Sequence, residues 1–391
     1  MTRPEVYVRR SDRSTVGDAS KWNRLTVAQR VVGVGRWTIE LADARTWELF
    51  HRDVNLRGWS RGVLILRGGM VLCSGWADEV DTQTSSGRPA WVVSGFDDND
   101  YLEKHLAWPQ PTQGISQQSW TGRHSEVGVV SETRWKAFCT ANLVNRLNLP
   151  GVVVPASQGR GEVNTSRSYF RSLLNITEGI HAGSGHALVF EVKQNLDRQI
   201  VVDVREKRNL VHSIQFSPDV DTATSWSAKS TTPNATRAIV AAGRELEDRQ
   251  HRLRTQEPTA HRAMRPELLV AAHGVDTNES GWQGEADSEG DAALVENRGR
   301  SSFQVQVNES PGHEYGPDYL VGDTVRAWLT EGQGADDPRV DDEITEAELT
   351  WSGGDFGSVS MWVGPKDDPD EYDARAERDL RRRVSRLERA M

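Results

Sequence analysis

The chain has 391 residues, a formal net charge of −10, a hydrophobic fraction of 36%, 34 Gly and 14 Trp. A chain of this length forms two or three domains, and many tryptophans and glycines with few aliphatic residues favour short, half-exposed strands. The acidic balance argues against a DNA-binding surface, because contacts to phosphate need clustered Lys and Arg.

The cysteines and the apolar runs limit the class of protein further. Cys73 and Cys139 fall in an expected strand and an expected helix, so we interpret both as buried free thiols and expect no disulfide framework. No apolar run reaches the length of a membrane-spanning helix, and the first residues lack the apolar segment of a signal peptide. We therefore expect a protein that is made in the cytoplasm and has no membrane partner.

The first quarter of the chain has the pattern of β-strands. Residues 37–41 alternate apolar and polar side chains, which places the apolar ones on one face. The apolar runs 63–66 and 70–73 are separated by Gly68 and Gly69, a pair that supplies the positive φ angles of a tight hairpin turn.

A third apolar run, 91–93, leads into an acidic cluster and a helix expected at about 98–106. We expect five or six strands between residues 5 and 111. A small sheet of this kind is most stable as a barrel or a sandwich.

The next segment changes to helical periodicity. Ser131 is a suitable N-cap and Pro150 ends the helix, whose apolar stripe is formed by Trp135, Phe138, Cys139, Val144 and Leu147. A polar loop at 156–168 precedes a second helix, whose apolar side carries Phe170, Leu173, Leu174 and Ile180. Strands are expected at 187–192 and 199–204, so this part reads as a compact α/β or α+β insert.

Strand character returns in the last part of the chain. Strands are expected at 211–216 and 237–242, whereas residues 244–300 are polar and show only a helix at 286–297. Alternating segments then close the body at 303–307, 342–351 and 357–363. The tail, 367–391, is expected to be a charged helix.

Two strings in the chain contain residue types that can carry chemistry. The run Asp97–Asp100 lacks the spacing of an EF-hand loop, and carboxylates at a helix N-terminus complement the helix dipole. In His181–His186, Ser184 is flanked directly by glycines, unlike the serine of a nucleophile elbow, and a helix C-cap explains these glycines. We expect no catalytic residue, no metal and no cofactor. The carboxylates and tryptophans still leave a sugar-cleaving pair or a sugar-stacking platform open.

The tail contains a short heptad seam. Leu380, Val384, Leu387 and Met391 are spaced as the core positions of a coiled coil, over about two heptads. Such a coil is too short to hold chains together unaided, and a single helix that packs on its own subunit fits the pattern equally well.

These segments together resemble a known family. The strings that carry the resemblance are Gly35–Leu41, the Gly-Gly hairpin through Ser74 and Gly75, Val93–Asp98 leading to Trp108 and Pro109, Tyr315–Val325, and Trp362–Pro365. They resemble the distal tail-hub proteins of long-tailed phages, and are most similar to the minor tail (baseplate hub) family of siphophages infecting actinobacteria. That family is similar to the N-terminal hub portion of tail-associated lysins.

The resemblance implies a β-rich α+β fold with two tube-like β-barrel domains, an α/β insert and a C-terminal helix. The expected divisions are a first barrel (1–118), the insert (119–209), a return to the barrels with a polar helical connection (210–300), a second barrel (301–365) and the C-terminal helix (366–391).

It also implies a non-enzymatic function. The expected protein is a homotrimeric hub at the distal end of the virion tail, which joins the sixfold tail tube to threefold tip proteins. Its partners would be a distal tail protein ring or tail tube, the tape measure protein and other tail-tip or fibre proteins. DNA would pass through the lumen without specific binding, and from the net charge we expect an acidic lumen. The seam Leu380, Val384, Leu387 and Met391 would lie on the threefold axis. The alternative is a carbohydrate-binding or carbohydrate-cleaving tail-tip protein.

Overall fold

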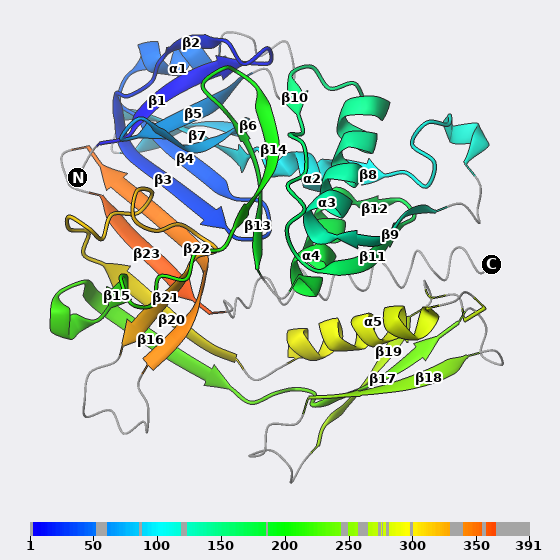
Figure 1. Ribbon diagram of the computed structural model, residues 1–391. Helices are drawn as coiled ribbons and strands as arrows, with labels where there is room; N and C mark the ends of the chain where they lie inside the picture. The colour runs from blue at the N-terminus through cyan, green and yellow to red at the C-terminus, as the bar shows by residue number, and fades with distance from the viewer. Residues whose placement is uncertain are drawn as a thin grey trace.

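Most strands of the protein belong to one large mixed sheet. The computed structural model describes residues 3–51, 61–85, 88–118, 123–184, 187–243, 249–256, 265–272, 275, 277–278, 281–297, 300–328, 339–353 and 357–364. Figure 1 shows the sheet on one side of the molecule and the helices α3, α4 and α5 on the other. The sheet has 13 strands, in the order β16-β20-β23-β22-β3-β4-β7-β6-β5-β1-β2, with β21 and β15 attached beside β22.

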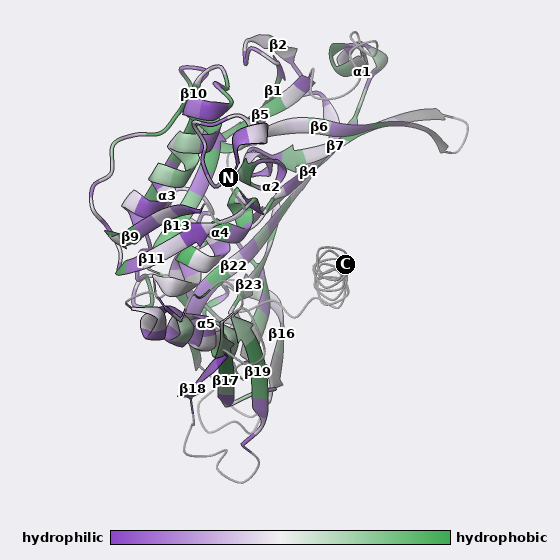
Figure 2. Cartoon of the chain, turned by 90° about the vertical axis from the view of Figure 1, so that its right-hand side faces the viewer, coloured by the Kyte–Doolittle hydropathy of each residue, from purple (hydrophilic) through white to green (hydrophobic). Residues whose placement is uncertain are grey.

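The N-terminal half of this sheet has more strands than the sequence predicted. Its elements are β1 (Glu5–Arg10), β2 (Thr15–Asp18), β3 (Trp22–Arg30), β4 (Arg36–Leu41), α1 (Ala44–His51), β5 (Arg61–Arg67), β6 (Met70–Ser85) and β7 (Arg88–Asp97). Gly68 and Gly69 have φ angles of 59° and 81°, which confirms the predicted hairpin between β5 and β6. Helix α1 was not predicted. Figure 2 shows β6 and β7 extending from the body as a ribbon.

The C-terminal half supplies the remaining strands. These are β15 (Gln215–Phe216), β16 (Ala223–Thr231), β20 (Arg300–Val307), β21 (Thr324–Trp328), β22 (Arg339–Ser352) and β23 (Ser358–Val363), with a short 3₁₀ turn, η3 (Pro218–Val220), before β16. The strand predicted at 211–216 is shorter than expected, because only its last two residues pair.

The two halves meet where β22 pairs with β3. Leu349 lies opposite Val27, and both are fully buried in a single hydrophobic cluster that runs through both halves. Pairing ends at β16 on one side and at β2 on the other, so no closed barrel forms among the described strands. Both predicted strand-rich regions are present, but they are joined edge to edge and share one core.

The insert follows β7 and has its own hydrophobic cluster. It consists of α2 (Asp100–Lys104), β8 (Leu106–Ala107), the 3₁₀ turn η1 (Ile115–Gln117), β9 (His124–Val130), α3 (Ser131–Cys139), the π-helical η2 (Thr140–Arg146), β10 (Val152–Val153), β11 (Val163–Ser168), β12 (Arg171–Ser172), α4 (Leu173–Gly183), β13 (Leu188–Gln194) and β14 (Ile200–Glu206). Trp135 on α3 donates to Thr177 Oγ1 on α4 at 2.8 Å, and both are buried.

Three local predictions for the insert were wrong. Ser131 is the first residue of α3 rather than its N-cap, and its hydroxyl donates to the carbonyl of Glu162 at 3.1 Å. The predicted loop 156–168 contains β11, which pairs with β9 despite its polar sequence, because both strands lie at the surface of the insert. Phe170 precedes α4, with a φ angle of 50°.

The segment with no clear sequence pattern forms a compact unit. The strands β17 (Arg237–Ala242), β18 (Gln250–Thr255) and β19 (Glu267–Ala272) form a sheet in the order β18-β17-β19, and α5 (Trp282–Asn297) packs on it. The predicted helix at 286–297 is confirmed but begins four residues earlier. The unit lies between β16 and β20, which pair with each other as far as Thr231 and Arg300.

Candidate functional site

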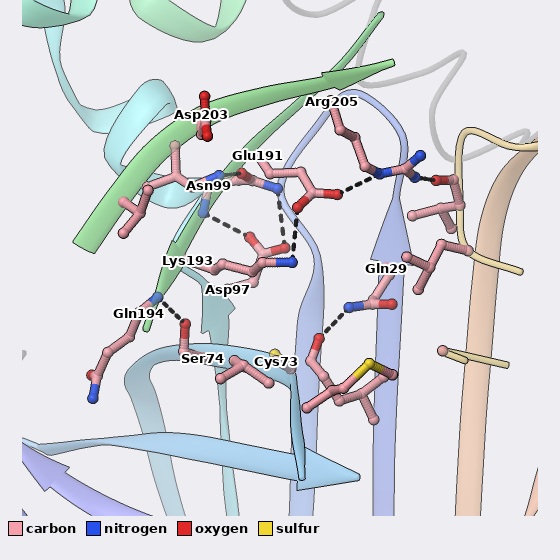
Figure 3. Close-up of a pocket in the computed structure, with 18 of the residues that line it drawn as sticks. Gln29, Cys73, Ser74, Asp97, Asn99, Glu191, Lys193, Gln194, Asp203 and Arg205 are labelled. Carbon is pink, nitrogen blue, oxygen red and sulfur yellow. Dashed lines mark hydrogen bonds and ion pairs between the residues drawn. The ribbon is translucent and has the colours of Figure 1, made fainter. Parts of the chain in front are cut away.

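A cleft separates the large sheet from the insert. It has a volume of about 530 Å³ and lies between β3, β6, the edge strand β13 with its neighbour β14, and the segment 315–321. Figure 3 shows polar side chains from the sheet and from β13 and β14 pointing into this space. Met70, the first residue of β6, and Leu196, in the turn between β13 and β14, line the cleft and are 44% and 64% exposed. It is the natural candidate site, because its volume is typical of ligand pockets.

A carboxyl group with a shifted pKa lies in the wall of the cleft. Asp97 accepts hydrogen bonds from Asn99, at 3.1 Å from the backbone N–H and 3.3 Å from Nδ2. Burial raises the pKa of Asp97 to about 8, and the neighbouring carboxylate of Asp98 contributes to the rise. Asp97 is therefore largely protonated at neutral pH.

A buried ion pair closes one end of the cleft. Arg9 on β1 binds Asp98 through two hydrogen bonds, of 2.5 and 2.9 Å, and both side chains are at most 1% exposed. Arg9 also donates to Gln194 Oε1 at 2.7 Å, and Ser74 donates to Asp98 at 2.5 Å. We call Arg9, Asp98, Ser74 and Gln194 the junction cluster. It links the sheet (β1 and β6) to the insert (β13).

Three further ion pairs lie at the other end of the cleft. Arg67 binds Glu309 at 2.7 Å with both side chains buried, and it also donates to the carbonyl of Tyr315 at 3.0 Å. Arg205 on β14 binds Glu191 at 2.9 Å and Asp323 at 3.0 Å, which connects the insert to the turn before β21.

Glu343 lies beyond this second end. Burial raises its pKa to about 7, although Lys207 at 3.4 Å opposes the rise. The cleft is thus bounded by charged groups that hold the sheet and the insert together.

Neither a reactive thiol nor a metal-binding group lies among the described residues of the cleft. Cys73 lines the cleft, but burial raises the pKa of its thiol well above the ordinary value, so it is not an activated nucleophile. Among the described residues, no group of three or more His, Cys, Asp and Glu is placed to hold a metal ion. The side chains around the cleft pair with one another, which suits a structural seam.

The sequence-predicted candidates lie apart from one another. Asp100 begins α2 as expected, but Asp98 belongs to the junction cluster and not to a helix N-terminus. His181 is buried near the end of α4, with Nδ1 at 2.9 Å from the carbonyl of Leu188, and Ser184 donates to the carbonyl of His181. Both cysteines are buried and free, as predicted. The seam Leu380, Val384, Leu387 and Met391 lies outside the described residues.

Sequence reasoning missed the junction cluster because its members are far apart in the chain. The only local signal was the acidic run at 97–100, which was explained by the helix dipole alone. Arg9 alternates with the buried Val6 and Val8, so the pattern expects it to be exposed, yet it is buried and therefore needs a buried carboxylate, which Asp98 supplies. None of the described helices is both long and apolar enough to cross a membrane.

Comparisons with known proteins bear on the fold and the family. A family model described as Siphovirus ReqiPepy6 Gp37-like protein matches residues 5–364. The search of curated proteins finds no match.

Among solved structures, a tail protein from Neisseria meningitidis MC58 is similar with a TM-score of 0.57 and 13% identity, over 93% of this chain and 97% of that one. The 43 kDa tail protein of prophage MuSo2 from Shewanella oneidensis has a TM-score of 0.55 and 9% identity, over 93% of this chain and 96% of that one. Prophage tail protein gp18 from Listeria monocytogenes EGD-e has a TM-score of 0.53 and 8% identity, over 96% of this chain and 99% of that one.

Proposed function

This chain belongs to the Siphovirus ReqiPepy6 Gp37-like protein family and has the fold of phage tail proteins, and we propose that it is a structural protein of the tail. In this proposal it forms a homotrimeric hub at the distal end of the tail, which joins the sixfold tube to threefold tip proteins and surrounds part of the DNA ejection channel. The observation that carries the proposal is the continuous sheet formed by the two strand-rich regions.

A continuous sheet suits a ring wall. Each copy would contribute two tube-like modules, the strands of 1–118 and those of 301–365, so that three copies present six modules to the tube above. The pairing of β22 with β3 would hold the two modules of one copy in register. Contacts between copies would be heterologous and would close by threefold rotation.

The other segments take peripheral places in this proposal. The insert, which contains the predicted domain 119–209, and the α5 unit, within 210–300, would lie outside the ring, and the tail, 366–391, would approach the threefold axis. The partners would be the distal tail protein ring or tail tube, the tape measure protein, and other tip or fibre proteins.

The sugar-binding alternative has less support. It requires exposed tryptophans beside two carboxylates, but among the described tryptophans only Trp328 is exposed, at 39%. Trp22, Trp37, Trp135 and Trp351 are instead buried in the two main cores. Each described carboxyl group that lines the cleft has an ion-pair or hydrogen-bond partner, which leaves none in the arrangement of a glycosidase pair.

The proposal is tested by locating the chain and by measuring its mass. Mass spectrometry of purified particles of the phage that encodes it should find the chain, and immunogold labelling should mark the distal end of the tail. Light scattering on the purified protein should give three times the 43.6 kDa of one copy. A protein that stays monomeric at all concentrations would overturn the trimeric hub. Absence of the chain from the particles would overturn the virion role.

A further inference from the structure

A cluster of aromatic side chains lies at one end of the insert. The rings of Trp108 and Phe170 meet edge to face with their centroids 5.8 Å apart, and Tyr169 packs on Phe170 in the same manner at 5.2 Å. All three side chains are half-buried, and Leu106 on β8 is 42% exposed. In Figure 1, β8 and the loop after it lie on the side of the insert that faces away from the large sheet. The cluster therefore presents apolar surface to solvent at the periphery of the molecule.

Two guanidinium groups without carboxylate partners accompany the cluster. Arg146 lies over the ring of Trp108, with Cζ 4.5 Å from the centroid. Its Nε donates to Asn142 Oδ1 at 3.2 Å and its Nη2 donates to the carbonyl of Leu106 at 3.0 Å, so both of these partners are uncharged. The exposed Arg171, on β12, also has no ion-pair partner in the described part of the chain. We call the following six residues the aromatic end of the insert: Leu106, Trp108, Arg146, Tyr169, Phe170 and Arg171.

The backbone fixes one ring of the aromatic end against its local preference. Phe170 has a φ angle of 50°, which a bulky residue rarely adopts. Its N–H donates to the carbonyl of Ala107 at 3.1 Å, and the next residue, Arg171, is the ladder partner of Ala107. Backbone strain of this kind concentrates at binding sites and persists where the surroundings hold it. The ring of Phe170 is thereby preorganised beside Trp108.

The loop that follows Trp108 is also preorganised. The side chain of Gln118 accepts a hydrogen bond from the N–H of Gln110 at 3.0 Å. It donates to the carbonyls of Gln110 and Gln113 at 2.8 and 3.1 Å. The loop presents Ile115, which is 65% exposed in the turn η1. A surface that is ordered before it meets a partner loses less entropy on binding.

The composition of the aromatic end is typical of the centre of a protein interface. Aromatic residues and Arg are enriched there, and Trp, Tyr and Arg supply most of the residues that dominate the binding energy. A carboxylate is the group that pairs best with a guanidinium in a planar, charge-assisted contact. The surface therefore fits an acidic and apolar partner segment. In the proposed ring the copies meet through the large sheet, and the aromatic end faces away from it.

Building on the proposed tail function, we propose that the aromatic end of the insert is the docking site for an acidic, apolar segment of a different tail protein. Carboxylates of that segment bind Arg146 and Arg171, and an apolar side chain packs against Leu106 and Trp108. The insert is in this way an attachment point of the hub for a peripheral tail component.

Cross-linking in purified particles of the phage that encodes the chain identifies the occupant. The photoreactive p-benzoylphenylalanine replaces Leu106 or, as a matched control, Leu196, which is 64% exposed in the turn between β13 and β14. After irradiation, mass spectrometry of the cross-linked peptides should join position 106 to an acidic segment of one other tail protein. Position 196 should not join to that segment.

Charge reversal then tests the guanidinium groups. In particles that carry Arg146→Glu, the cross-linked protein should fall at least about tenfold relative to the chain itself, because a buried contact to a carboxylate becomes a repulsion. Arg171→Glu changes an exposed side chain that the fold does not need, and should cause a smaller loss of the same protein. Arg198→Glu, exposed in the turn that carries Leu196, should leave the composition of the particles unchanged. Replacement of the cross-linked acidic residue by Lys should restore the protein to Arg146→Glu particles.

Three results would overturn the inference while leaving the tail function intact. One is a cross-link from position 106 to a second copy of this chain, or to no protein. Another is the wild-type composition in particles of both Arg146→Glu and Arg171→Glu. The third is an unchanged composition with poorer adsorption to host cells, because the aromatic end then binds the cell surface. Absence of the unmodified chain from the particles would instead overturn the proposed function itself.

Discussion

Arg9 and Asp98 are separated by 89 positions in the chain, yet they form a bidentate ion pair with almost no exposure to solvent. Removing one partner of such a pair leaves the other charge buried without compensation. Arg9→Met should therefore lower the free energy of unfolding by about 3–5 kcal/mol. Urea unfolding followed by tryptophan fluorescence measures this change.

The neighbouring residue provides the control for this substitution. Arg10 is exposed at the end of the same strand, so Arg10→Met removes the same charge from solvent and should change the free energy of unfolding by less than about 0.5 kcal/mol. Equal effects of the two substitutions would show that the junction cluster does not hold the insert.

Asp97 makes stability depend on pH. Its pKa is about 8 in the folded protein, above the value of about 4 of an unfolded chain, so the folded state binds the proton more tightly. The resulting stability is present in full below about pH 4 and is lost as the pH rises towards 8. In Asp97→Asn this loss should disappear, so the variant should gain stability relative to the wild type between pH 6 and about 8. A series of urea titrations across this range provides the measurement.

Glu343 requires a separate variant, because burial also raises its pKa, to about 7. Glu343→Gln should remove the part of the pH dependence of the unfolding free energy that lies below about pH 7. Should Asp97→Asn keep the full wild-type slope between pH 6 and 8, Asp97 would not be the group responsible.

At the level of elements, the β5–β6 hairpin depends on two glycines with positive φ angles. No atom lies within 4 Å of a Cβ added at Gly69, so its φ angle of 81° is what limits substitution there. Gly69→Ala should therefore destabilise the protein by about 1 kcal/mol through backbone strain. Gly114→Ala, at a φ angle of −67°, should be neutral or slightly stabilising. Thermal unfolding of the two variants compares them directly, and an equal fall in melting temperature would contradict the turn argument.

Sequence patterns identified elements well where one face of the element is buried. The alternation at 37–41 and the strand character of 237–242 predicted β4 and β17, and the stripes around Trp135 and Leu173 predicted α3 and α4. The patterns failed where neither face is apolar, as in β11, or where an element is short and mixed, as in α1.

The candidate site was harder to predict than the elements. The pairing of β22 with β3, and the contacts of Arg9 with Asp98 and of Arg67 with Glu309, join residues that are far apart in the chain. Local periodicity carries no information about such partners, so only the acidic run at 97–100 hinted at the cleft.

For the whole molecule, the trimer proposal makes a prediction about the tail, which lies outside the described residues. Leu387→Asp places a charge in the heptad seam and should expose the tail, while the protein stays trimeric because most contact area would lie in the sheets. Hydrogen exchange of 366–391 should accelerate, with an unchanged mass by light scattering. Ser385→Asp adds the same charge outside the seam and should leave exchange unaltered. Unchanged exchange in Leu387→Asp would remove the coil from the proposal.

The position of the α5 unit has a consequence for how this protein can vary. The chain leaves the large sheet after Thr231 and returns at Arg300, and these two residues are direct partners in the β16–β20 ladder. The fully buried Phe303 and Val305 on β20 fix the register of this ladder, so the register does not depend on what is attached beyond the last pair. The segment between them can therefore lengthen, shrink or be exchanged for another module without disturbing the large sheet, which makes it a suitable site for grafting foreign domains.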